Sequence, residues 1–435
     1  MAHATARDAY SHLVERLNRF PQGAPPSDLL FRILGILFTE DEAELVARLP
    51  IKPFTLEAAA RAFGLPATEA ERVLDGLASR ALLLDIRDGR ERRWLLPPPM
   101  AGFFEFSMMR VRGDVDQREL GRLFYRYLNE EEDFVRDLFG RGQMRLGRAF
   151  VDEEVLAPVQ AREETEPLEV LDWERASEVV RGASDAAVGT CYCRHKMSHA
   201  GRACDAPMEI CLTFGSTASS LVRHGFARRI QKAEALDLLH EARGRGLVQF
   251  GENVRRRPAF VCNCCGCCCE ALLAHRRFGA LQPVQTTGFA PWVDPASCTG
   301  CGACAKACPV DAMTTVPAGD PAAPRRRTAR LDERTCLGCG VCTRACAKGA
   351  LRLVRRQARI IPPLDTVHRT VVMALERGNL ADLVFDDRTL ASHRVLGAVL
   401  GAILKLSPVR RLLATEQVKS RYLEALCERW EARKG

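Results

Sequence analysis

The spacing of apolar residues predicts helices over much of this chain. Before residue 50, "DLLFRILGILFTEDEAELVARL" repeats apolar residues at helical spacing, and residues 115–180 continue that pattern. Residues 227–250 predict an amphipathic helix that ends at Gly244 or Gly246 and leads into a strand. We therefore expect a helical segment at residues 1–52 and a helical connector at 100–180.

The pattern changes between residues 53 and 99. Thr55 can cap a helix that ends near Phe63, and "GLP" at 64–66 forms a turn before a second helix with a capping box of Thr68 and Glu71. "ALLLDI" and "RRWLL" then predict two strands joined by Asp88-Gly89, a hairpin signal.

A helix–turn–helix followed by a hairpin resembles the winged-helix family over residues 53–99. The resemblance raises the question of DNA binding, for which a recognition helix needs basic residues to displace counterions. The second helix instead carries Glu69, Glu71 and Asp75 against Arg72. DNA binding is therefore disfavoured, and a protein-contact or structural role is favoured.

The C-terminal residues 355–435 predict a helical tail with three helices: near Thr366–Glu376, from about Thr389 to Leu406, and after Pro408. The apolar run Val395–Leu404 is too short to cross a bilayer, which needs about 20 residues. Flanking basic residues make a helix on a membrane surface possible. We favour a core helix that covers the cysteine repeat at residues 289–354, because Gly397 and Gly401 share one face and permit close packing.

Cysteine usage points to metal binding. The N-terminal residues carry charges where a signal peptide would be apolar, so we expect a cytoplasmic protein, in which thiols stay reduced. Eighteen of the 19 cysteines fall between Cys191 and Cys346, in groups of four, six and eight. Cys427 stands apart and is expected to be a buried structural thiol. Clustered cysteines in a reduced compartment are typical of metal ligands.

The group of eight forms an internal repeat. "VDPASCTGCGACAKAC" (293–308) aligns without gaps on "LDERTCLGCGVCTRAC" (331–346), and all four cysteines coincide. Each half reads Cys-x2-Cys-x2-Cys-x3-Cys, a spacing that brings three thiolates to neighbouring corners of a cubane.

This repeat resembles the bacterial dicluster ferredoxin family over residues 289–354. In that family the fourth cysteine of each run ligates the other cluster. The resemblance implies two 4Fe-4S clusters, each with three ligands from one half and one from the other. The first set is Cys298, Cys301, Cys304 and Cys346, and the second is Cys336, Cys339, Cys342 and Cys308.

The other ten cysteines lie in a cysteine-rich domain at 181–270. The first four, which can complete one tetrahedral site, are Cys191, Cys193, Cys204 and Cys211. The remaining six are Cys262, Cys264, Cys265, Cys267, Cys268 and Cys269. Neighbours in this run point apart, so alternate cysteines must face different partners. We expect one further iron–sulfur cluster or zinc here, with His195 and His199 near the metal or on the surface.

Together these patterns predict an α+β multidomain protein, mostly helical, with a winged-helix-like N-terminal domain, a cysteine-rich middle domain and a two-cluster ferredoxin-like domain. No phosphate loop, dinucleotide-binding glycine motif or Ser-His-Asp pattern is present. The net charge is about +12 in residues 271–435 and about −4 in 1–270, which favours an acidic partner for the C-terminal half. The leading hypothesis is electron transfer with a redox partner protein. The alternative is a redox-sensing regulator that binds DNA through residues 53–99.

Overall fold

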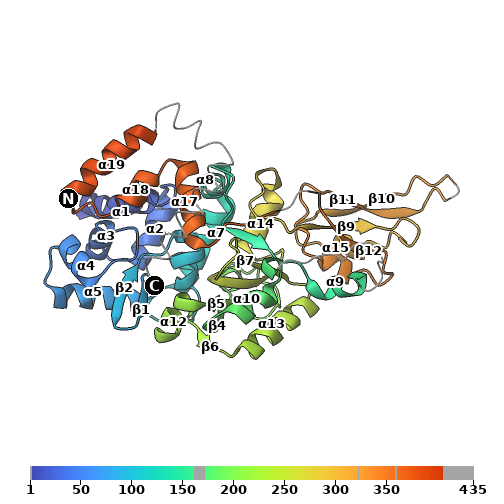
Figure 1. Ribbon diagram of the computed structural model, residues 1–435, viewed down its shortest axis with the longest axis horizontal. Coiled ribbons are helices and arrows are strands. Elements are labelled where there is room, and N and C mark those ends of the chain that lie inside the picture. Colours follow the sequence, from blue (N-terminus) through green and yellow to red (C-terminus); the bar gives the residue numbers. More distant parts are fainter. Residues whose placement is uncertain (1, 161–171, 322, 358–359, 405–435) are drawn as a thin grey trace. The chain divides into compact units, whose positions relative to one another are not determined.

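The computed structural model describes residues 2–160, 172–321, 323–357 and 360–404, which form two compact units (Figure 1). Among the described residues, the first unit combines 2–144 with 216–228 and 363–404, and the second contains those between 145 and 215 and between 229 and 362. Segments far apart in sequence therefore share a unit. The predicted connector at 100–180 is divided between the two units at residue 144.

The first unit is mainly helical. Its helices are α1 (Ala2–Arg19), α2 (Asp28–Leu37), α3 (Glu40–Ala47), α4 (Leu56–Phe63), α5 (Ala67–Ser79), α6 (Phe104–Ser107), α7 (Gln117–Tyr125), α8 (Asp133–Gly140), α12 (Gly215–Arg223), α17 (Thr366–Arg377), α18 (Leu380–Val384) and α19 (Ala391–Leu404), with π-helical turns at Pro99–Phe103 and Arg126–Glu130. The core of α2 is Leu30, Ile33 and Leu34, which are fully buried. This spacing is the apolar stripe that the sequence predicted.

Residues 53–99 form two helices and a hairpin. Thr55 caps α4, and Gly64 ends it with a left-handed φ of 70°. The capping box predicted at Thr68 and Glu71 is wrong, because α5 begins at Ala67 after Pro66 and has no side-chain cap. Strands β1 (Leu84–Asp88) and β2 (Glu91–Leu95) pair antiparallel.

Asp85 explains why residues 216–228 belong to the first unit. Its side chain is fully buried and accepts hydrogen bonds from the Ser220 hydroxyl at 2.7 Å and the Arg223 guanidinium at 2.9 Å, both from the α12 segment. Burial alone would raise the pKa of Asp85. The hydrogen bonds from these donors and from His224 instead hold this pKa below its ordinary value. The carboxylate therefore stays charged and joins β1 to α12.

The C-terminal tail differs from the prediction. α17 and α19 match two of the three expected helices, α18 was not predicted, and the third helix and Cys427 lie outside the described residues. A Cβ at Gly397 would lie 3.5 Å from the Cβ of Phe385, so the glycine face packs beside α18 as close packing requires. α19 belongs to the first unit and none of its described residues is buried, and the expectation that it covers the ferredoxin-like repeat at residues 289–354 stays a prediction. Within the described part of the chain, no helix has the length and apolar character needed to span a bilayer.

The second unit is built on a six-stranded sheet, which the sequence did not predict. The strand order is β3-β7-β8-β5-β4-β6, and each neighbouring pair from β3 to β4 is antiparallel. The strands are β3 (Gly147–Ala149), β4 (Ala186–Thr190), β5 (Glu209–Phe214), β6 (Arg228–Arg229), β7 (Val248–Glu252) and β8 (Phe260–Cys264). Most of these strands are buried on both faces, so they lack the polar–apolar alternation that identifies a strand.

Helices and two smaller ribbons complete this unit (Figure 1). The helices are α9 (Glu153–Gln160), α10 (Ala176–Gly182), α11 (Tyr192–His199), α13 (Lys232–Gly244), α14 (Glu270–Arg277), α15 (Ala303–Ala307) and α16 (Val341–Arg344), with 3-10 turns at Asp172–Glu174 and Gly279–Leu281. β9 (Phe289–Val293) pairs with β12 (Leu351–Arg355), and β10 (Met313–Pro317) pairs with β11 (Arg327–Leu331). Because the first strand of this region pairs with the last, its two halves are interleaved.

Candidate metal centres

The two halves of the repeat have the same local structure. The Cys298 N–H donates to the Asp294 carbonyl at 3.0 Å, and the Cys336 N–H donates to the Asp332 carbonyl at 3.1 Å. Gly302 and Gly340, both with left-handed φ, then begin the short helices α15 and α16. Such turns place backbone N–H groups around the cysteine sulfurs, which suits negatively charged thiolate ligands.

One set of four cysteines lines a cavity that draws on both halves. Cys308 from the first half and Cys336, Cys339 and Cys342 from the second surround a hollow of about 310 Å³, counted with the solvent at its mouth. Pro309, Val310, Leu337 and Gly338 also line it. Burial raises the pKa of Cys336 and Cys339, and that of Cys342 to about 12, so these three thiols need a cation nearby to become thiolates. The composition of this cavity suits an iron–sulfur cluster.

The other set lies closer to solvent. Cys304 is buried in an apolar cluster that Cys298 and Cys346 also contact, whereas Cys301 is exposed. Burial, followed by negative charge on Cys298 and Cys346, raises the pKa of Cys304. The structure thus brings each fourth cysteine of the repeat to the opposite half, as the interleaved ribbons require.

Residues 297–350 match the family model of the 4Fe-4S dicluster domain. The segment is of the dicluster ferredoxin type. No curated protein and no solved structure was found that matches the chain. The match covers the repeat and leaves the rest of the chain to be interpreted from its own geometry.

Gly338, between the first and second cysteines of its half, has no space for a side chain. Its φ is 71°, and a Cβ there would lie 2.1 Å from the Phe289 carbonyl oxygen. We expect Gly338→Ala to displace Cys336 and Cys339 and to reduce iron bound by the dicluster domain by about half. Gly349→Ala is the matched control, because Gly349 has a φ of 62° but a Cβ there would meet nothing within 4 Å. Equal iron loss in both variants would show that backbone strain, and not the close contact, is responsible.

Three of the ten middle cysteines lie together on the large sheet. Leu212 of β5 pairs with Val261 of β8, so Cys211 and Cys262 are cross-strand neighbours one step further along. Cys264 follows Cys262 by two residues and therefore faces the same side of β8.

Cys191, Cys193 and Cys269 complete a closed ring of six thiols with these three. Cys191 follows β4, Cys193 is in the first turn of α11, and Cys269 is the N-cap residue of α14. Each ring member contacts two others, in the order Cys191, Cys193, Cys269, Cys264, Cys262, Cys211 and back to Cys191. Contacts with the neighbouring thiols lower the pKa of Cys191, Cys262 and Cys269 and raise that of the three between them.

The remaining four middle cysteines form a separate group. The sulfurs of Cys204, Cys265, Cys267 and Cys268 all lie within 4.8 Å of one another. This division differs from the grouping by sequence, because Cys204 leaves the first four and joins three members of the six-cysteine run. The expected tetrahedral site within residues 191–211 is therefore not what the structure assembles. The expected alternation holds for Cys264 and Cys265, which belong to different groups, but it is wrong for Cys267 and Cys268, which lie in a turn and belong to the same group.

A buried arginine lies beside both groups. Arg194 is fully buried and donates to the carbonyls of Pro207 and Asn263, each at 2.8 Å. Burial alone would lower the pKa of Arg194, but negative charge on Cys191 and Cys265 raises it above its ordinary value. A guanidinium held here stabilises negative charge on thiolates of both groups, such as those of Cys191 and Cys265.

Two further features were not predicted from the sequence. Lys196 pairs with Glu270 in an interior where the Lys196 side chain is fully buried. His195 and His199, which were expected near the metal or on the surface, have their Nε2 atoms 3.2 Å apart. Seventy-four residues separate Lys196 from Glu270, and no local signal connects them.

Proposed function

We propose that this protein transfers single electrons through two 4Fe-4S clusters to or from a cysteine-rich centre at residues 191–269. Cys298, Cys301, Cys304 and Cys346 would hold one cluster, and Cys308, Cys336, Cys339 and Cys342 the other. When bound, such clusters accept and release one electron at a time at potentials that the surrounding protein sets. The residues of this chain supply thiolates, backbone N–H donors and an apolar surround.

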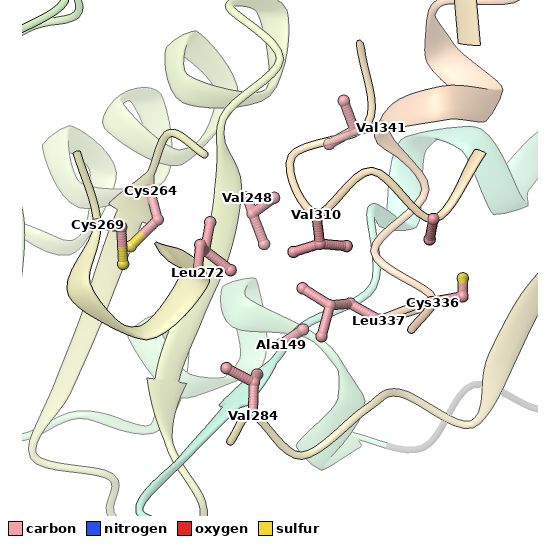
Figure 2. Close-up of a cluster of buried hydrophobic side chains, with 11 residues drawn as sticks. Ala149, Val248, Cys264, Cys269, Leu272, Val284, Val310, Cys336, Leu337 and Val341 are labelled. Atoms are coloured by element: carbon pink, nitrogen blue, oxygen red, sulfur yellow. The ribbon is translucent and has the colours of Figure 1, made fainter. Parts of the chain in front are cut away.

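The observation that carries this proposal is the apolar contact between the dicluster domain and the middle thiols. Cys264, Cys269 and Cys336 belong to one buried cluster in which Leu272, Val310 and Leu337 lie between them (Figure 2). This packing excludes water between the two cysteine regions. A dry, close-packed medium of this kind suits electron transfer, because little surrounding solvent has to reorganise.

Helix α14 makes the connection directly. It begins after Cys269, contributes Leu272 to the apolar cluster, and places the His275 Nε2 atom 2.8 Å from the Thr335 carbonyl oxygen, beside Cys336. Gly266 packs against Pro309, next to Cys308, so closely that a Cβ would meet the Pro309 oxygen at 2.3 Å. The four cysteines that line the cavity are therefore the dicluster set that lies nearer to the middle thiols.

The outer set would exchange electrons with a partner protein. Cys301 is exposed, and the β10–β11 hairpin covers this loop, with the Ala329 N–H 3.4 Å from the Cys298 sulfur. The hairpin exposes Arg325, Arg327 and Arg330. A basic surface beside an exposed cluster ligand fits an acidic redox partner, whose approach it would accelerate.

Reversing the charge of this hairpin tests the proposed entry point. We expect the triple variant Arg325→Glu, Arg327→Glu and Arg330→Glu to be reduced about tenfold more slowly by an acidic donor such as reduced flavodoxin at low salt. Reduction by dithionite, a small reductant, should keep its rate. Stopped-flow absorbance under anaerobic conditions measures both rates.

Arg256→Glu is the control, because Arg256 is exposed elsewhere in the same unit. An unchanged rate in the triple variant, or the same decrease in the control, would contradict docking at this hairpin. If full anaerobic reduction produces no cluster EPR signal at all, the electron-transfer proposal itself fails.

The regulator hypothesis has less support from the arginines of the β1–β2 hairpin. Arg92 lies over the Trp94 ring and pairs with Asp75, and Arg87 lies 3.5 Å from Asp85. Arg93 pairs with Glu91. Arginines that already pair with carboxylates have less to gain from phosphate contacts.

A further inference from the structure

The four-thiol group has the dimensions of a site for one metal ion. The sulfur of Cys204 lies 3.5 Å from that of Cys265 and 3.8 Å from that of Cys268, and the sulfurs of Cys267 and Cys268 are 3.7 Å apart. A zinc–sulfur bond of about 2.3 Å gives a regular tetrahedron of sulfurs about 3.8 Å apart. A cubane binds each cysteine to a different iron, so its ligand sulfurs stand farther apart than this. The group therefore matches a single tetrahedral ion of the zinc class.

The six-thiol ring has a different arrangement. Cys211, Cys262 and Cys264 come from adjacent strands, and Cys191, Cys193 and Cys269 come from the starts of helices that face them. A single tetrahedral ion binds four thiolates and would leave two ring members without metal. A ring in which each thiol has two thiol neighbours instead suits several metal ions that share ligands.

Charge leads to the same conclusion. Six thiolates around one divalent ion would leave a buried net charge of about −4, which is costly in a low-dielectric interior. Arg194 supplies one positive charge, and it interacts with Cys191 of the ring and Cys265 of the four-thiol group. Lys196 adds little, because Glu270 pairs with it. At least two metal ions are therefore needed to bring the ring close to neutrality.

We propose that the ten middle thiols form two distinct metal sites: a single-ion zinc site at Cys204, Cys265, Cys267 and Cys268, and a centre of two or more iron ions that share thiolate ligands in the ring of Cys191, Cys193, Cys211, Cys262, Cys264 and Cys269. The choice of iron for the ring rests on the proposed function, because the apolar cluster connects the dicluster domain to Cys264 and Cys269. Zinc has no redox chemistry, so the four-thiol site has a structural role. It fixes the Cys265–Cys268 turn beside the ring.

Metal counts in two variants test this division. The full chain is purified anaerobically, and iron, zinc and acid-labile sulfide are measured per chain. We expect about one zinc, and iron clearly above the roughly eight that two cubanes contain. Cys267→Ala should remove the zinc and leave iron unchanged, and Cys264→Ala should reduce iron to about eight and leave zinc unchanged. X-ray absorption spectroscopy of the zinc in the wild-type protein should show four sulfur ligands at about 2.3 Å.

Several results would overturn the proposal. They are loss of the same metal in both variants, a wild-type iron count of about eight, or two or more zinc ions with no extra iron. If Cys264→Ala does not fold, the wild-type counts and Cys267→Ala still decide, because Cys267 is exposed. EPR of the two dicluster signals is recorded on the same samples. Intact dicluster signals without extra iron would refute the iron centre in the ring and leave electron transfer by the dicluster domain standing.

Discussion

Cys339→Ala is expected to abolish one of two reduced 4Fe-4S EPR signals and to remove about four iron ions per chain. Cys339 lines the cavity with Cys308, Cys336 and Cys342, and its removal leaves three thiolates for that cluster. Cys336 and Cys342 beside it are buried, so water has little access to replace the missing ligand. EPR of the dithionite-reduced protein, together with iron analysis, measures the effect.

Cys301→Ala is the matched variant for the outer set. Cys301 occupies the same position in the first half of the repeat but is exposed. Cys301→Ala should affect the other reduced 4Fe-4S EPR signal. The loss of iron should be smaller than in Cys339→Ala, because solvent can supply a replacement ligand. Loss of the same signal in both variants would refute the crossed assignment of ligands.

Glu270→Gln is expected to destabilise the second unit by about 3–5 kcal/mol, because it removes the carboxylate that pairs with a buried charge. The Lys196 side chain is fully buried and that of Glu270 is 7% exposed. Glu270 is also the first residue of α14, where the helix dipole favours a negative charge. Urea denaturation of the metal-loaded protein, followed by far-UV circular dichroism and by the cluster absorbance, measures the change.

The double variant Lys196→Met with Glu270→Leu is the control. It replaces the ion pair with apolar groups and leaves no buried charge, so it should recover most of the lost stability. If the double variant is as unstable as Glu270→Gln, the carboxylate stabilises the unit through something other than its pairing with Lys196.

Local patterns in the sequence were sufficient for the elements that depend on neighbouring residues. The stripe of Leu30, Ile33 and Leu34 predicted α2, and Thr55 and Gly64 marked the ends of α4. At the start of α5, Pro66 and the Thr68 capping box predicted different first residues, and the prediction from the capping box was wrong. Pro66 starts α5 earlier than the capping box predicted, because its fixed φ suits the residue that precedes a helix.

The six-stranded sheet could not be recognised from local patterns. Ile210, Leu212 and Phe214 of β5 are buried together with their neighbours Cys211 and Thr213, so the strand has no polar face to reveal its period. Similarly, the apolar run of α19 predicted a helix packed against another part of the chain. Which part lies beside it depends on tertiary contacts, and the sequence pattern does not contain these.

The sequence by itself determined the ferredoxin-type repeat, because its cysteines are held in tight turns whose spacing is a local property. It also separated Cys264 from Cys265, since neighbouring residues of a strand point to opposite faces, but this rule does not extend to Cys267 and Cys268, which lie in a turn. Only the tertiary structure decided which partners these are. Cys211 meets Cys262 through strand pairing, and Cys204 joins Cys265, Cys267 and Cys268 across about 60 residues of chain. Ligand sets assembled by sheet register and helix packing leave no spacing pattern in the sequence.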